Sequence, residues 1–417
     1  MTANAYSCIF CPGIGVMSMK AALRVLALIA SGAVAACGTP GGLLGPVVDI
    51  PETNQKVALY VATSRAPSST DAALIFGGDR ARTPNHGRIV VAIPPNHVTG
   101  ELELPGRPPG DPKQHFVAAE RDLFGDKDFI ERIRRAVAAR PPHERDVLVF
   151  IHGYNTRFDD AVFRFAQIVH DSGFKGVPVL FTWPSRGSLL AYPYDRESAV
   201  YSRDDLDNLL QAIATKTGAR KFDILAHSMG GFLTAEVLRG AAMRGNGRYN
   251  GKLDQAMFAA PDIDIDVFRR QLEKITPQRL PITVFVSADD KALGFSRFVW
   301  GSTNRAGAFT VTDPVMAQRL AAANVTVVDL SDVKTSDSLG HGKFAASPKV
   351  VQMIGGRLAA DGGIKSRGPS LGESLVVVGS SLGHTVGGVA AGVVAAPVKV
   401  LEGKDPVPAT LKEAHEQ

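Results

Sequence analysis

The sequence predicts an α/β fold in which helices cover both faces of a mostly parallel central sheet. Several short segments are apolar at nearly every position, as in "DVLVFIHG" (146–153). Strands that lack an apolar–polar alternation are buried on both faces, which is typical of parallel sheets. Segments with helical spacing alternate with these strands, as in "FDDAVFRFAQIVHDSG" (158–173). This alternation predicts that helices pack on both sides of the sheet.

The strands and helices are expected in a regular order along the chain. Strands are predicted where apolar, β-branched residues gather in short runs: 56–64, 88–94, 146–153, 177–184, 222–228, 255–262, 281–290 and 324–332. Helices are predicted over 158–173, 197–217 and 230–243, with further helical stretches between the later strands. Residues 99–116 hold several Pro and Gly residues, which predicts an irregular loop.

Composition narrows the class of protein. A chain of 417 residues has room for one large domain or two modest ones. Its net charge of +5 is spread without long basic runs, so a nucleic-acid partner is not indicated. The three cysteines, Cys8, Cys11 and Cys37, all precede the globular part, which excludes a disulfide framework for the core.

The N-terminal segment has the three parts of a secretory signal. In residues 19–38, two basic residues precede an uncharged apolar run, and small residues then lead to Cys37. The sequence Val-Ala-Ala-Cys at 34–37 resembles a bacterial lipobox, which implies that Cys37 becomes the lipidated first residue after cleavage. Gly38 after the cysteine favours sorting to the outer membrane, on its periplasmic side. An uncleaved membrane anchor is the alternative.

The domain organisation follows from these segments. We expect a signal peptide over 1–37, a Gly- and Pro-rich tether over 38–54, one catalytic domain over 55–360 and a Gly-rich tail over 361–417. Within the tail, residues 374–398 carry no charged side chain, and glycines recur there every fourth residue. That pattern is compatible with helices that approach closely in a membrane, or with a flexible or surface-packed segment.

A candidate nucleophile lies where a predicted strand meets a predicted helix. The residues Ala-His-Ser-Met-Gly at 226–230 follow the pattern of a nucleophile elbow, with Ala226 in place of the first glycine. Residues two before and two after the nucleophile crowd together in such a turn, so both must be small. The pattern therefore predicts that Ser228 is a nucleophile, and the alternative is a small residue that merely joins a strand to a helix.

Acyl transfer also requires hydrogen-bond donors for an oxyanion. The backbone N–H of Met229, which follows the candidate nucleophile, is expected to be one donor. The other should come from a loop after an earlier strand. The turn His152-Gly153 ends the strand 146–153 and would present the N–H of Tyr154.

Three histidines follow Ser228 and could supply the base that activates it. His384 lies in the Gly-rich tail and His415 lies near the end of the chain. His341 lies in a loop soon after the last apolar strand, where a base could reach the nucleophile. His227 directly precedes the serine and cannot fold back onto it, so we expect it to be a packing residue.

The acid that orients the base should lie between the serine and the histidine in the chain. Asp289 and Asp290 directly follow the strand that ends in "ITVFVS", and Asp262 follows the preceding strand. Asp290 is preferred, and Asp262 and Asp289 stay open.

Several ordered blocks resemble a bacterial α/β-hydrolase family of unknown function in the esterase/lipase superfamily. They cover roughly residues 55–355 and include "VFIHGYNTRFDDAVFRFAQIVHD", "LFTWPSRG", "YDRESAVYSRDDL", "ILAHSMGG", "PDIDIDVFRRQL", "SADDKALGFSR" and "SLGHGKF". The resemblance implies an α/β-hydrolase fold and a triad of Ser228, Asp290 and His341. It also includes Trp183, Pro184 and Ser185, for which the residues alone indicate no role.

The sequence therefore predicts a serine hydrolase that cleaves a carboxylic ester through an acyl-enzyme. The expected substrate is a small-molecule or lipid ester. No cofactor or metal is expected, because the chain has no H-E-x-x-H string, paired-Cys site or P-loop. The alternatives are an acyltransferase, an amidase, or a non-catalytic binding or scaffold protein of the cell envelope. The oligomeric state is not indicated.

Overall fold

The computed structural model describes most of the predicted catalytic domain. The described residues are 41–69, 74–299, 305–308, 320, 322–335, 339–359 and 375–377. Two compact units divide the chain at Gly41 and Gly42, and only residue 41 of the first unit is described. Several predictions therefore lie outside the described residues: the signal segment with Cys37, the tail residues 361–374 and 378–417, and His384 and His415.

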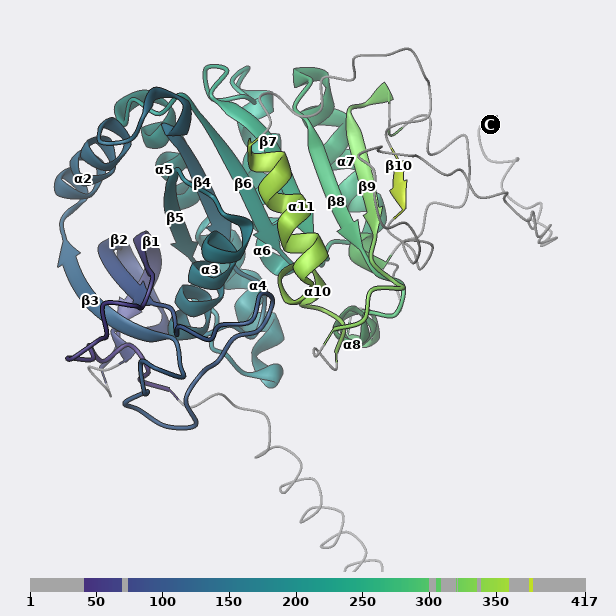
Figure 1. The fold of residues 1–417 in the computed structure, drawn as a ribbon. Helices are drawn as coiled ribbons and strands as arrows, with labels where there is room; N and C mark the ends of the chain where they lie inside the picture. The colour runs from purple at the N-terminus through teal and green to yellow at the C-terminus, as the bar shows by residue number, and fades with distance from the viewer. Residues whose placement is uncertain are drawn as a thin grey trace, which may run out of the picture. The chain divides into compact units, whose positions relative to one another are not determined.

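Within the described residues, one sheet of ten strands runs through the second unit in the order β10-β9-β8-β7-β6-β4-β5-β1-β2-β3 (Figure 1). Its strands are β1 (Lys56–Pro67), β2 (Phe76–Ala92), β3 (Val117–Phe124), β4 (Asp146–Ile151), β5 (Val177–Thr182), β6 (Lys221–His227), β7 (Leu253–Ala259), β8 (Ile282–Val286), β9 (Val325–Asp329) and β10 (Leu375–Val377). In this sheet order, every pair of neighbouring strands from β10 through β1 is parallel. Only β1–β2 and β2–β3 are antiparallel among these pairs. The predicted mostly parallel sheet is confirmed.

Helices cover both faces of this sheet (Figure 1). They are α2 (Asp126–Ala138), α3 (Phe158–Ser172), α4 (Tyr192–Tyr201), α5 (Arg203–Lys216), α6 (Met229–Met243), α7 (Ile265–Ile275), α8 (Lys291–Val299), α10 (Lys343–Ala346) and α11 (Pro348–Ala359). Alternate residues of β4 face opposite cores. Val149 packs in the core that contains residues of α2, α5 and α6. Phe150 packs in the core of α3 and α11, where it stacks on Phe165 at a ring distance of 5.1 Å.

Three elements differ from the sequence prediction. β2 begins at Phe76, well before the predicted start at residue 88, and β3 was not predicted at all. β3 has a largely exposed second half, "ERDLF", so the sequence lacks the apolar run on which the prediction depends. The predicted helix 197–217 is two helices, α4 and α5, which meet at Ser202.

Part of the predicted tether packs on the domain. Residues 41–54 are described, and in this range Leu43 and Leu44 are buried in the core that contains α3. Asn54 is also buried, and its side-chain amide donates to the backbone oxygens of Ile93 and Pro112. Because glycines and prolines surround the leucine pair, composition alone does not reveal that this segment is packed.

Two findings concern the segments for which membrane contact was considered. No helix in the described parts of the chain is both long enough and apolar enough to span a bilayer. Of the predicted tail, residues 375–377 form β10, which pairs in parallel with β9. The remainder of segment 374–398 lies outside the described residues.

Candidate active site

Ser228 occupies a strained backbone conformation between β6 and α6. Its φ of 53° and ψ of −121° lie in a region that residues with a side chain rarely adopt. The turn is held by backbone hydrogen bonds. The N–H of Ser228 donates to Ala259 O at 2.9 Å, and its carbonyl accepts from the N–H of Gly231 and of Asp262. The turn therefore has the geometry that the sequence pattern predicts for a nucleophile elbow.

Two glycines let the end of β4 approach this turn closely. A Cβ at Gly230 would lie 2.2 Å from the carbonyl oxygen of His152. A Cβ at Gly153 would lie 2.8 Å from Cβ of Ser228 and 2.8 Å from Nδ1 of His227. Any side chain at either position would push the two segments apart. The loop that carries Tyr154 is thus next to Ser228.

The structure brings His341 and Asp290 into direct contact. Nδ1 of His341 lies 2.6 Å from Oδ2 of Asp290, although 51 residues separate them in the chain. The other carboxylate oxygen of Asp290 accepts the backbone N–H of Leu293 at 3.0 Å, and its side chain is fully buried. The carboxylate is therefore fixed at the start of α8, and it favours the tautomer of His341 that carries a proton on Nδ1.

His227 connects this pair to the serine turn. Its ring lies 4.6 Å from the ring of His341 and 4.7 Å from the ring of Phe344. Its Nε2 donates to the backbone oxygen of His341 at 3.1 Å. Burial and the nearby His341 lower the pKa of His227 well below its usual value, so the ring is neutral. His227 packs as predicted. Because it directly precedes Ser228, its hydrogen bond also links the backbone of His341 to the serine turn.

Asp289 contacts a different group from Asp290. Its two oxygens accept hydrogen bonds from Nζ of Lys343 at 2.7 and 2.9 Å. Lys343 is buried and also donates to the carbonyl oxygens of Leu330 and Ser331. Burial opposes ionisation of Asp289, but the hydrogen bonds from Lys343 and Ser287 and the charge of Lys343 together outweigh it and lower the pKa of the carboxyl. Asp289 thus holds the start of α10, two residues after His341.

Asp262 belongs to a third cluster. Its carboxylate accepts from Tyr192 at 2.5 Å and from Ser296 at 2.6 Å, and it lies 3.4 Å from Nε of Arg305. The sequence left three aspartates open as the partner of the histidine. Among them, it is Asp290 that forms a hydrogen bond with His341.

The loop after β4 is built on the buried ring of His152. Nε2 of this ring accepts the backbone N–H of Trp183 at 3.2 Å, and Nδ1 donates to Gly153 O at 2.8 Å. The indole N–H of Trp183 donates to His152 O at 2.9 Å, and the two rings stack at 4.9 Å. Burial and the charge of Arg65 lower the pKa of His152 to about 3, so the ring is neutral at neutral pH.

Arg65, near the end of β1, is buried beside the loop after β4 and binds this loop and two other segments. Its guanidinium is 1 % exposed and donates to the backbone oxygens of Ser185, Thr156 and Gly77 at 2.8 to 2.9 Å. Burial lowers its pKa to about 10, which leaves it charged at neutral pH. Arg65 therefore ties the segments after β4 and β5 to the start of β2.

Asp195 completes the same network from α4. Its carboxylate accepts from the hydroxyl of Ser185 at 2.6 Å and from the N–H of Arg186 at 2.9 Å. The oxygen of Ser185 in turn accepts the N–H of Thr156 at 3.1 Å. Trp183 and Ser185, for which the residues alone gave no role, thus hold the loop that carries Tyr154. Sequence reasoning missed Arg65 and Asp195. The one local signal was the charge of Arg65 near the end of the apolar strand β1.

Comparison with known proteins decides the family. Residues 129–357, more than half of the chain, match the family described as alpha/beta hydrolase of unknown function (DUF900). The chain belongs to this family. The match to DUF900 confirms the predicted fold class, and it contains Ser228, Asp290 and His341.

Other similarities to this DUF900 chain are partial. An uncharacterized protein from Nostoc sp. is 43% identical over 58 residues, which are 14% of this chain and 15% of that protein. An esterase of Pyrobaculum calidifontis is 12% identical, with a TM-score of 0.29, over 66% of this chain and 80% of that one. An alpha/beta hydrolase from the metagenome of Lake Arreo is 11% identical, with a TM-score of 0.32, over 81% and 95%. Similarity at these levels carries no functional conclusion.

Proposed function

We propose that the protein is a serine hydrolase that cleaves a carboxylic ester through Ser228, His341 and Asp290. The main support is the 2.6 Å contact between His341 and Asp290, together with the contacts of His341 with His227, which directly precedes the strained residue Ser228. A serine hydroxyl is a weak nucleophile until an oriented base removes its proton. Membership in the alpha/beta hydrolase family supports the same class of reaction.

In the proposed mechanism, Nε2 of His341 takes the proton of the Ser228 hydroxyl as its oxygen attacks the ester carbonyl carbon. The carbonyl π pair moves onto oxygen, and the backbone N–H groups of Met229 and Tyr154 hold this oxyanion. When the tetrahedral intermediate collapses, the ester C–O bond breaks and His341 gives its proton to the leaving alcohol. Water, deprotonated by His341, then attacks the acyl carbon. The bond from this carbon to Oγ of Ser228 breaks, His341 returns the proton to Oγ, and the acid is released.

The surroundings of His341 suit a base that becomes charged in each cycle. Asp290 lies on Nδ1, where its negative charge stabilises the imidazolium. His227, the nearest aromatic neighbour with a titratable ring, is neutral and adds no repulsion. The first turn of α6 begins at Met229, and its positive end favours the negative charge that develops on the substrate.

An apolar acyl group is the substrate feature that we propose. Leu189 and Leu190 are exposed, Leu190 by 90 %, in the short segment that accepts the hydrogen bond of the Tyr154 hydroxyl. These two adjacent leucines give the segment that contacts Tyr154 an apolar surface, to which we assign the acyl chain. We expect the ester to present a hydrocarbon chain to these leucines.

The test is hydrolysis of a panel of nitrophenyl esters with acyl chains of increasing length. The wild-type protein should release both nitrophenol and free acid, and Ser228→Ala should lower kcat/KM by about 10⁴-fold or more. Ser172→Ala, at the end of α3, is the matched control and should keep its activity. No turnover of any ester by the folded wild type would reject the proposal. Equal turnover by Ser228→Ala would reject it as well.

Attachment to a membrane by a lipid on Cys37 is a separate proposal. Its support is the signal-like segment and the small residues before this cysteine. Wild-type protein should fractionate with membranes, and Cys37→Ala should move it to the soluble fraction. An unchanged distribution of the variant would reject lipid attachment, whatever the outcome of the ester panel.

A further inference from the structure

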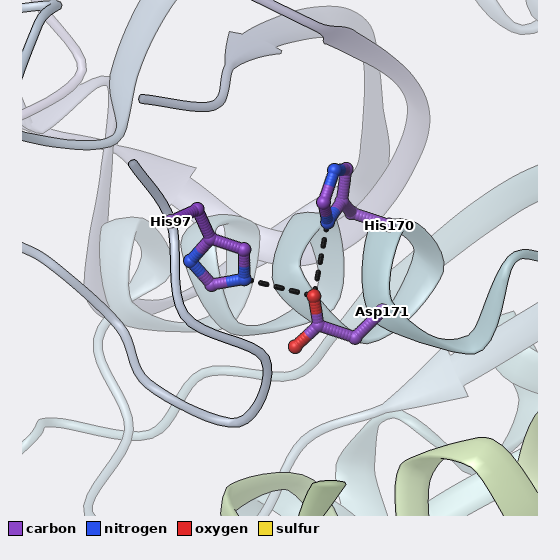
Figure 2. Close-up of side chains that lie close together, drawn as sticks. All are labelled: His97, His170 and Asp171. Atoms are coloured by element: carbon purple, nitrogen blue, oxygen red, sulfur yellow. Dashed lines mark hydrogen bonds and ion pairs between the residues drawn. The ribbon is translucent and has the colours of Figure 1, made fainter. Parts of the chain in front are cut away.

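A second cluster of histidine and carboxylate side chains lies outside the candidate active site. His97 comes from the loop after β2, and His170 and Asp171 come from the end of α3 (Figure 2). Nε2 of His97 lies 2.8 Å from Oδ1 of Asp171, and Nδ1 of His170 lies 2.9 Å from the same oxygen. Figure 2 shows both rings directed at this one carboxylate. All three potential ligand atoms lie within 4.8 Å of one another.

We propose that His97, His170 and Asp171 bind a divalent metal ion of the Zn²⁺ class. Two imidazole nitrogens and a carboxylate oxygen are ligands that zinc accepts, and three protein ligands leave a fourth position for water. The proposal is independent of the role of Ser228. No metal motif in the sequence indicates it, because His97 and Asp171 are 74 residues apart.

The hydrogen-bond partners of His97 and Asp171 are of the kind that orient the ligands of a metal ion. Nδ1 of His97 lies 2.7 Å from Oε2 of Glu103, so this nitrogen donates its proton to a carboxylate and Nε2 faces the cluster. Metal-binding histidines commonly donate their second ring N–H in this way. Oδ2 of Asp171 accepts from Gln167 at 2.6 Å and from the N–H of Gly100 at 2.8 Å. These bonds leave Oδ1 directed at the two rings.

The three ligand atoms must adjust their spacing to admit the ion. Tetrahedral zinc with ligands at about 2.0–2.1 Å keeps them about 3.3 Å apart, so the present 2.8 and 2.9 Å separations must widen by about 0.5 Å. The two ring nitrogens, which lie within 4.8 Å of each other, must reach the same spacing. His170 is partly exposed, which gives it room to move and gives the ion a path from solvent. The side chains of His97 and Asp171 are buried and fixed. The ion replaces the protons that the rings now share with Oδ1.

A metal ion at this site would stabilise α10, the helix that follows His341. Gln167, which orients Asp171, also donates to the backbone oxygen of Ala345 in α10 at 3.1 Å. Gly100 packs so tightly that an added Cβ would lie 2.5 Å from the oxygen of Ala346. The ion would therefore join the loop of His97, the end of α3 and α10, and we expect it to raise thermal stability.

The experiment is a zinc titration of the untagged full chain after dialysis against a chelator. Calorimetry should give one Zn²⁺ per chain, and Tm should rise with zinc concentration. His170→Gln should lower the affinity at least about tenfold, and Glu103→Gln, which alters only the group behind His97, about tenfold. His143→Gln removes a well-exposed histidine elsewhere and should bind zinc like the wild type.

Two results would overturn the proposal. One is the lack of stoichiometric zinc binding by the folded wild type, which would leave the cluster as a set of hydrogen bonds only. The other is equal affinity in wild type, His170→Gln and Glu103→Gln, which would place any bound zinc elsewhere on the chain. Glu103→Gln keeps its side-chain volume, so the test does not depend on one variant that fails to fold.

Discussion

Two histidine–carboxylate clusters in this protein use the same groups in different ways. At the candidate active site, Nδ1 of His341 contacts one buried carboxylate, Asp290, beside the strained turn. In the second cluster, carboxylates contact both nitrogens of His97, Glu103 at Nδ1 and Asp171 at Nε2. Burial disfavours the charged ring of His97, but the two carboxylates outweigh it and raise the pKa.

The difference concerns what each imidazole can do. A base in acyl transfer must take and return a proton in every cycle, so its catalytic nitrogen has to face the nucleophile. A ring between two carboxylates holds its protons or exchanges them for a metal ion. It has no nitrogen left to act as the base for a serine. The partner of the second nitrogen, more than the presence of a carboxylate, therefore decides the chemistry.

The largest expected effect separates the two clusters directly. His341→Gln should lower kcat/KM for an ester by about 10⁴-fold or more, because Ser228 loses its base. His170→Gln should leave kcat/KM close to the wild-type value in zinc-free buffer. Steady-state kinetics on both variants provide the check, and a large loss in His170→Gln would remove the distinction.

The two neighbouring aspartates offer the next comparison. Asp290→Asn should lower kcat by roughly 10³- to 10⁴-fold, because an amide at this position favours the wrong tautomer of His341. Asp289→Asn should mainly lower Tm, because it weakens the bond to buried Lys343. Kinetics and thermal unfolding of both variants measure this, and equal loss of activity would show that the two carboxylates are not distinct.

Arg65 should affect catalysis without touching the reacting atoms. Arg65→Lys keeps the charge but cannot reach all the backbone oxygens that the guanidinium now binds, so the Tyr154 loop should loosen. We expect kcat to fall by about 10²-fold, within the range for loss of one oxyanion donor, while KM changes little. A fall in Tm with kcat unchanged would mean that Arg65 stabilises the fold only.

A smaller effect is expected at His227. His227→Phe keeps an aromatic ring against Phe344 but removes the hydrogen bond to the backbone of His341. One such bond contributes about 1 kcal/mol, which corresponds to a loss of about fivefold in kcat. Measurement of kcat distinguishes weaker positioning of His341 from a direct role of His227, since only a direct role would abolish turnover.

The pH dependence of stability should reveal the neutral ring of His152. Its pKa is lowered from 6.5 to about 3, so the unfolded chain binds a proton there before the folded chain does. The stability that this neutral ring contributes is present above pH 6.5 and is lost as pH falls toward 3. His152→Asn should unfold at a lower temperature at pH 7 but show a shallower fall of Tm over this interval. Parallel Tm–pH curves would contradict this.

Local patterns predicted the elements that depend on neighbouring residues. The parallel strands were visible as apolar runs, and the turn at Ser228 was visible because a strand, two small positions and a helix occur within a few residues. Asp290 and His341 could be ranked by their positions after β8 and β9, but only the folded chain brings their side chains together.

The groups that the sequence missed are joined by contacts over long separations. Arg65 reaches Ser185, which is 120 residues away, and no spacing rule connects them. His97 and Asp171 likewise meet only because the loop after β2 packs on the end of α3. Leu43 and Leu44 were hidden by the glycines and prolines around them, so burial rather than composition identified their role.

The most direct test of the proposed nucleophile is covalent labelling with a fluorophosphonate probe. The folded wild-type protein should be labelled once, at Ser228, and His341→Gln should be labelled far more slowly, since the serine lacks its base. Labelling should vanish in Ser228→Ala, with Ser172→Ala as the control that still reacts. Persistent labelling of Ser228→Ala, or an unreactive wild type, would contradict the account.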